Sequence, residues 1–166
     1  MIFNPVSGQT VTFLSMTPDS LRTRFEVEPG RPADPRHIHP LQVETITVIE
    51  GRILGRFPDK TERVLVPGQK WEIPAGSSHT WAPIDVHVQL HIDFRPALRT
   101  RRLMTRLFGL AEAGKTNSRG IPGPLQVSVT ALEYEREFRL ASPPWGVQKM
   151  LFSALAPLAR TFGYRP

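Results

Sequence analysis

Residues 37–51 read HIHPLQVETITVIEG and hold three side chains that can bind a metal: His37, His39 and Glu44. Residues two apart in an extended chain point to the same face, so both histidines can reach one metal from one strand end. A straight strand would put Glu44 on the opposite face from His39, but Pro40 disfavours continuous strand pairing and favours a bend. After that bend Glu44 can return to the same cavity, in a strand that Gly51 ends.

A second stretch, residues 68–83, reads GQKWEIPAGSSHTWAP and supplies a fourth candidate ligand, His79. Its glycines and Pro74 build turns that deliver the strand carrying this histidine. The chain has no cysteine, so a transition metal must be held by imidazole and carboxylate groups. Three imidazoles and one carboxylate suit one divalent transition metal, which can be Fe, Ni, Mn, Cu, Co or Zn. Such a set leaves one or two positions for water, substrate or dioxygen.

Together the two stretches resemble the paired sequence motifs of the cupin superfamily. The first has the HxH pair, the glutamate and the closing glycine, and the second has the pattern G-x5-P-x-G-x2-H. The resemblance covers about residues 25–94. It departs at Gly30, which lies seven rather than six residues before His37, and at Pro83, where the second motif commonly has asparagine. The resemblance implies a short barrel of two antiparallel sheets, and metal binding by His37, His39, Glu44 and His79.

Residues 1–94 read as many short strands rich in β-branched and aromatic side chains, a pattern typical of a sandwich or closed barrel. Turn signals separate them at Pro29-Gly30, Glu50-Gly51, Pro58-Asp59, Pro67-Gly68 and Pro74-Ala75-Gly76. We therefore predict an all-β fold, a double-stranded β-helix of the cupin jelly-roll type, over residues 1–95. Residues 96–166 are predicted to form a helical C-terminal extension that packs on the barrel or on a dimer partner.

Within the extension, apolar residues recur at helical spacing from Pro96 to about residue 113. Residues 125–140 fit either a strand or a helix, and residues 147–162 follow helical spacing with Pro157 expected to kink or interrupt the helix. Four arginines, three or four apart, are predicted to lie opposite the apolar stripe of the first helix: Arg95, Arg99, Arg102 and Arg106. The apolar stripes predict either cover for a barrel face or a homodimer interface.

Three residues are candidates for a substrate pocket. Trp81 lies two residues from His79 and should share its face, where it either walls an apolar pocket or packs in the core. Residues 86–94 alternate between polar and apolar side chains. If the polar face lines the barrel interior, Gln89 and His91 contact the site or the substrate. If it faces solvent, which the pattern favours, they are ordinary residues of a half-buried strand.

The formal net charge of +6 is unevenly distributed along the 166 residues. Residues 1–93 carry a net charge of −2 and residues 94–166 a net charge of +8. This asymmetry favours a solvated helical face over an anionic partner, and contact of the basic helix with a membrane surface is a less favoured alternative. No nucleic-acid-binding motif is present, and we expect no nucleic-acid partner. The sequence shows neither a signal peptide nor a long apolar run, which predicts a cytoplasmic protein.

The ligand set predicts a metal-dependent enzyme that acts on a small organic molecule. An oxygenase-type reaction is the first expectation, because the resemblance extends to dioxygenase cupins. Glu44 can act as both ligand and proton acceptor, which makes it the candidate catalytic residue. Isomerase or decarboxylase chemistry on the same site, and a non-catalytic module that binds or senses a small ligand, are the alternatives, since a fold and a metal do not define a reaction.

Overall fold

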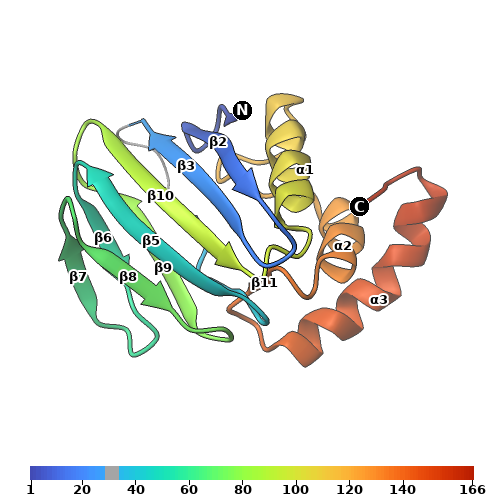
Figure 1. Cartoon of the computed structure of the whole chain (residues 1–166). Helices are drawn as coiled ribbons and strands as arrows, with labels where there is room; N and C mark the ends of the chain where they lie inside the picture. The colour runs from blue at the N-terminus through green and yellow to red at the C-terminus, as the bar shows by residue number, and fades with distance from the viewer. Residues whose placement is uncertain (29–33) are drawn as a thin grey trace.

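The computed structural model describes residues 1–28 and 34–166, where two antiparallel sheets are followed by helices (Figure 1). The expected turn at Pro29-Gly30 and the spacing of Gly30 from His37 lie outside the described residues. The strands are β1 (Ile2–Asn4), β2 (Gln9–Met16), β3 (Leu21–Val27), β4 (His37–Ile38), β5 (Val43–Glu50), β6 (Ile53–Arg56), β7 (Glu62–Leu65), β8 (Lys70–Ile73), β9 (Ser78–Pro83), β10 (Val88–Arg95) and β11 (Arg139–Leu140). The helices are α1 (Thr100–Glu112), α2 (Pro124–Glu133) and α3 (Trp145–Thr161).

The first sheet has the order β1-β2-β3-β10-β5-β8, and the second has the order β11-β4-β9-β6-β7. Strand β5 shows why the chain folds this way: Glu44, Ile46 and Val48 are buried, while Thr45 and Thr47 between them are only half-buried. This period-two alternation directs one face of the sheet toward the core. Buried apolar side chains from both sheets form one cluster, and the predicted two-sheet barrel with a helical C-terminal extension is confirmed.

Gly51 ends β5 as the sequence predicts, because the chain there needs a conformation that other residues rarely adopt. Its φ is +72°, in the left-handed region that favours glycine. A Cβ atom at this position would lie 2.2 Å from the carbonyl oxygen of His87. The tight turn brings β6 back beside β9 in the second sheet.

The first helix begins later than its apolar pattern predicts, at Thr100 rather than at Pro96. The carbonyl oxygens of Pro96 and Ala97 accept hydrogen bonds from the side chain of Gln42, at 2.7 and 3.2 Å. Leu98 has a φ of +44°, which is incompatible with a continuous right-handed helix. The segment is therefore shaped by its attachment to the barrel rather than by helical periodicity.

The ambiguous stretch of residues 125–140 contains both structures that its pattern allowed. Its first part belongs to α2, and its end forms β11, a two-residue strand paired with β4. Helix α3 continues through Pro157, so the predicted interruption is absent. Phe152, Ala156 and Ala159 are buried on both sides of this proline, so tertiary packing supports the helix before and after it.

The extension packs on the barrel at its α1 end, where Ala97 and Phe108 join the barrel core cluster. Helices α2 and α3 pack on each other through a second, smaller cluster that includes Val129. Helix α3 exposes Met150, Leu151 and Leu158, and Phe162 directly after it is exposed as well; the dimer interface expected of such a face stays a prediction. No helix among the described residues is both long enough and apolar enough to cross a membrane.

The four arginines predicted to share one solvated face do not do so. Arg95 belongs to β10, and Arg99 precedes the first turn of α1. Arg99 forms ion pairs with Glu133 and Glu137, and Arg106 donates a hydrogen bond of 2.7 Å to the carbonyl oxygen of Arg165. Helical spacing predicted that they share one face, but Arg99 and Arg106 instead bind residues of other segments of the extension.

Candidate metal centre

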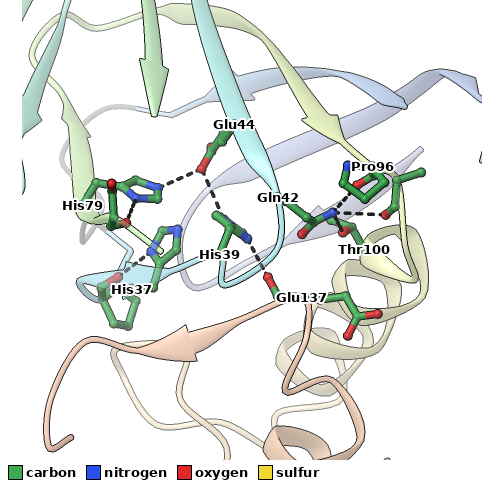
Figure 2. A network of polar contacts seen from close by, with 11 residues as sticks. His37, His39, Gln42, Glu44, His79, Pro96, Thr100 and Glu137 are labelled. Carbon is green, nitrogen blue, oxygen red and sulfur yellow. Dashed lines mark hydrogen bonds and ion pairs between the residues drawn. The ribbon is translucent and has the colours of Figure 1, made fainter. Parts of the chain in front are cut away.

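The four predicted ligands converge in the barrel interior, each delivered by a separate strand or strand end (Figure 2). His37 lies in β4 directly opposite His79 in β9, and His39 follows β4 at the bend around Pro40. Glu44 returns from β5, as the bend predicts. One ligand atom from each of the four lies within 4.8 Å of the others. All four side chains are buried, and His79 is fully enclosed.

Hydrogen bonds orient all three imidazoles in the same sense. The Nδ1 atoms of His37, His39 and His79 lie 2.8, 2.6 and 3.1 Å from the backbone carbonyl oxygens of Pro35, Glu137 and Ser77. A carbonyl oxygen can only accept, so each Nδ1 carries the proton and each neutral ring presents an unprotonated Nε2. This is the arrangement by which proteins orient histidine ligands of metals.

The Nε2 atoms gather around one carboxylate oxygen. Oε2 of Glu44 lies 2.7 Å from Nε2 of His79 and 3.2 Å from Nε2 of His39. An unprotonated Nε2 and a carboxylate oxygen are both acceptors, so these short distances require a cation or an extra proton between them. Three imidazole nitrogens and one carboxylate oxygen fit a divalent transition metal in that role. The predicted four-residue cluster is therefore present, and occupancy by a metal stays a prediction.

The electrostatics of the cluster favour the ligand forms of His37 and Glu44, but they favour the protonated form of His79. Burial lowers the pKa of His37 to about 3, with His39 and His79 acting in the same direction, so this imidazole is neutral at pH 7. Burial raises the pKa of the Glu44 carboxyl, but hydrogen bonds and charge interactions with His39 and His79 outweigh burial and hold the pKa well below its usual range. Burial likewise lowers the pKa of His79, and its hydrogen bond to Glu44 reverses the shift and raises it. The raised pKa favours a proton on His79, and a bound cation would compete with that proton.

A cavity of about 210 Å³ adjoins the cluster, with His37, His39 and Glu44 in its wall. Its lining is mainly apolar and comes from both parts of the chain. The barrel contributes Phe25, Trp81 and Phe94, and the extension contributes Leu103, Phe138 and Phe152. Trp81 therefore lies where the sequence placed it, although its ring also packs edge-on against Phe25 in the core. Trp81 thus combines cavity lining with core packing, and its role in a substrate pocket stays a prediction.

Gln89 and His91 do not line this cavity, so their assignment to the pocket does not match the structure. Ile92 and Phe94 of the same strand do line it. Since side chains alternate along a strand, Gln89 and His91 point to the opposite face of the first sheet. Gln89 there donates a long hydrogen bond of 3.5 Å to Glu26. The reading in which they belong to the half-buried outer face is the one that the structure supports.

Three residues of the site were missed by the sequence patterns. Asp34 lines the cavity, and its carboxyl accepts a hydrogen bond of 3.1 Å from Gln9. Loss of hydration raises the pKa of Asp34, and this effect is larger than the lowering by the hydrogen bond from Gln9. Its position three residues before His37 is the one sequence signal that points to it. Glu137 and Phe138 lie about 100 residues beyond the histidines that they contact, and no local pattern marks them.

A two-sheet barrel with a buried cluster of three histidines and one glutamate is the arrangement that the resemblance to cupins implies. Residues 23–85 match the family described as Cupin domain, so the chain carries a cupin domain that contains all four candidate ligands. No curated protein matches the sequence.

Solved structures show the same fold at low sequence identity. An RmlC-like cupin from Shewanella frigidimarina NCIMB 400 has a TM-score of 0.55 at 18% identity, over 61% of this chain and 87% of that one. KdgF from Halomonas sp. has a TM-score of 0.53 at 18% identity, over 57% and 85% of the two chains. TT1209 from Thermus thermophilus has a TM-score of 0.52 at 21% identity, over 58% and 90%. Likeness at these identities establishes the fold alone.

Proposed function

We propose that this protein is a metal-dependent enzyme that acts on a small, mainly apolar organic molecule, with an oxygenase-type reaction as the first chemistry to test. The observation that carries the proposal is the direct contact between the apolar cavity and the four-residue cluster, of which His37, His39 and Glu44 line the cavity. Active sites commonly combine an apolar cavity with a few convergent polar groups of this kind.

The cavity supports a compact substrate. A cavity of about 150 Å³ lined by Leu, Ile and Phe is large enough to bind benzene. The cavity beside the cluster measures about 210 Å³ and is therefore suited to a molecule with one substituted ring or a short aliphatic chain. Among its lining residues Arg119 is the one arginine, it is exposed, and there is no lysine. This lining favours an apolar substrate over a sugar phosphate, and hence oxygenase chemistry over sugar-phosphate isomerisation.

The residues around the cluster have distinct proposed roles. A divalent transition metal bound by the three histidines and Glu44 would supply a Lewis acid and, for redox-active ions, a partner for dioxygen. Glu44 is the proposed proton acceptor among the ligands. Asp34 also lines the cavity, and loss of hydration raises its pKa, so we propose it as a second proton carrier. Phe94 and Trp81 exclude water from the space between the substrate and the cluster.

The first experiment is elemental analysis of the purified protein, beside a His37→Ala/His79→Ala variant. We expect near-stoichiometric iron, nickel, copper or manganese in the wild type and its loss in the variant. A His87→Ala/His91→Ala variant is the matched control, because it removes two histidines outside the cluster and should keep its metal.

The second experiment measures oxygen consumption by the metal-loaded protein with single-ring aromatic and short aliphatic compounds. Oxygen uptake that depends on both metal and substrate supports the oxygenase. Zinc as the sole bound metal would leave the site standing and count against the oxygenase. Absence of metal under every loading condition would favour a non-catalytic module that binds a small ligand, with ligand affinity unchanged by a chelator.

A further inference from the structure

The three histidines of the cluster differ in where their Nδ1 protons are held. His37 and His79 each donate to a backbone carbonyl two residues earlier, at Pro35 and Ser77. His39 instead donates to the carbonyl oxygen of Glu137, 98 residues later in the chain, at 2.6 Å. The first two rings are thus oriented by their own strands, whereas the orientation of His39 depends on the C-terminal extension (Figure 2).

The side chain of Glu137 holds the segment that carries this carbonyl in place. Glu137 is only 1% exposed, and its Oε1 accepts hydrogen bonds from the backbone N–H of Arg99 at 3.1 Å and from Nε of Arg99 at 3.2 Å. The same guanidinium donates to the carboxylate and the backbone carbonyl of Glu133, and it lies 5.0 Å from the ring centre of Tyr134. Arg99 therefore binds the end of α2 and the turn after it, residues 133–137, to the start of α1.

Contacts beyond Glu137 extend this attachment to the metal cluster. Phe138 stacks on the ring of His37, with centroids 4.9 Å apart and planes inclined by 23°. Arg139 and Leu140 then pair with Ile38 and His37 in β11 and β4. A displacement of the turn would consequently move the acceptor of His39 and the packing of His37 together.

We propose that Arg99 and Glu137 are positioning residues for the ligand His39, so that the helical extension completes the metal site of the barrel. The inference rests on the proposed metal site. The ion pair holds the Glu137 carbonyl at hydrogen-bond distance from Nδ1 of His39, which keeps Nε2 of that ring aimed at the centre of the cluster. Partners of this kind around a metal ligand change metal affinity by about 10–100-fold when they are lost.

The test measures Co²⁺ affinity by chelator competition, together with the visible spectrum of the Co²⁺ complex. Glu137→Ala and Arg99→Ala should each weaken binding by about 10–100-fold and change the spectrum. The double variant should be no weaker than the worse single variant, because both changes release the same carbonyl. Glu137→Gln keeps an oxygen that accepts both bonds from Arg99 and should retain most of the affinity.

Val129→Ala is the control for a purely structural effect. Val129 is 1% exposed and packs between α2 and α3, away from the cluster, so its truncation should lower the melting temperature without changing Co²⁺ affinity. Wild-type Co²⁺ affinity and spectrum in Glu137→Ala, at a comparable loss of stability, would overturn the inference. Equal weakening in Val129→Ala would do the same.

A readout without metal separates this inference from the proposed function. In the metal-free protein, the Nδ1 proton of His39 should give a downfield, slowly exchanging imidazole resonance, assigned by its loss in His39→Gln. We expect that resonance to vanish or move strongly in Glu137→Ala and to persist in Val129→Ala. Persistence in Glu137→Ala would refute the positioning role even if the protein binds no metal. Absence of Co²⁺ binding by the wild type would refute the metal site and leave this resonance to decide the positioning role.

Discussion

Replacement of Gln42 by methionine should destabilise the protein strongly, although the change conserves side-chain size. Gln42 is fully buried, and its Nε2 lies 2.7 Å from the Pro96 oxygen, 3.2 Å from the Ala97 oxygen and 2.8 Å from Oγ1 of Thr100 (Figure 2). An amide has two N–H protons, so these three contacts amount to two full hydrogen bonds, one of them shared. Methionine would remove both protons and leave the Pro96 and Ala97 carbonyls buried without that donor.

The size of the effect follows from those lost bonds. Each hydrogen bond contributes about 1 kcal/mol net, and a buried acceptor left unpaired costs about 1–3 kcal/mol. The Oε1 atom of Gln42 is itself buried with no partner among the described residues, so its removal offsets part of the cost. We therefore expect Gln42→Met to reduce the free energy of unfolding by about 3 kcal/mol, which for a chain of this length lowers the melting temperature by about 6–12 °C.

Urea and thermal unfolding of the metal-free protein provide the measurement. Gln89→Met is the control, because Gln89 is half-buried and makes one long hydrogen bond, and it should change stability by less than about 0.5 kcal/mol. A loss of less than about 1 kcal/mol in Gln42→Met would show that the start of α1 is not held by these bonds. The anchoring of the extension to the bend between His39 and Glu44 would then need another explanation.

Three further predictions concern pH, the cavity and a turn. The metal-free protein should lose stability as pH falls from about 6.5 toward 3, because unfolded His37 takes up a proton in that window while the folded residue, with its pKa of about 3, does not. Urea titrations at several pH values should give a smaller change of the free energy of unfolding with pH for His37→Gln. An unchanged dependence on pH would contradict the assignment to His37. Below the usual glutamate pKa, the depressed pKa of Glu44 should add to this loss, and Glu44→Gln should remove that part. Ala131→Phe fills the cavity from α2 and should abolish binding of an apolar fluorescent probe while Co²⁺ affinity stays at the wild-type value; retained probe binding would place the ligand elsewhere. Gly51→Ala should lower the free energy of unfolding, measured by thermal unfolding, by at least about 2 kcal/mol. Its φ of +72° and a Cβ 2.2 Å from the His87 carbonyl oxygen both oppose a side chain at this position. An unchanged stability would mean that the turn relaxes freely.

The cluster of three histidines and one glutamate was predictable from sequence because its information is local. The spacing of His37 and His39 determines a shared face, and Pro40 marks the bend that returns Glu44 to it. His79 requires only that a second strand cross the same interior, which the β4–β9 pairing provides. Each ligand could thus be assigned from its own few neighbours, without knowledge of the rest of the chain.

The polar face of β10 shows the limit of such local patterns. Alternation in residues 86–94 separates two faces but does not say which one meets the cavity. The structure turns Leu90, Ile92 and Phe94 inward because they fill the core between the sheets, which leaves Gln89 and His91 outside. The start of α1 shows a similar limit. Helical spacing predicted a helix from Pro96, but it gave no sign of the hydrogen bonds from Gln42 to the Pro96 and Ala97 carbonyl oxygens, and the helix begins at Thr100.

The remaining features of the site depend on contacts between distant segments, which a single sequence does not encode in any short pattern. His39 and Glu137 are 98 residues apart, and nothing about a glutamate after α2 marks its backbone carbonyl as the acceptor for a ligand imidazole. The match to the cupin family ends at residue 85, before every cavity residue that the extension contributes. The four-residue cluster therefore lies inside the matched residues, whereas the cavity-lining residues Leu103, Phe138 and Phe152 lie beyond them. Ligand screens that test the proposed function should therefore follow the shape and apolar lining that the extension gives the cavity, and not the barrel alone.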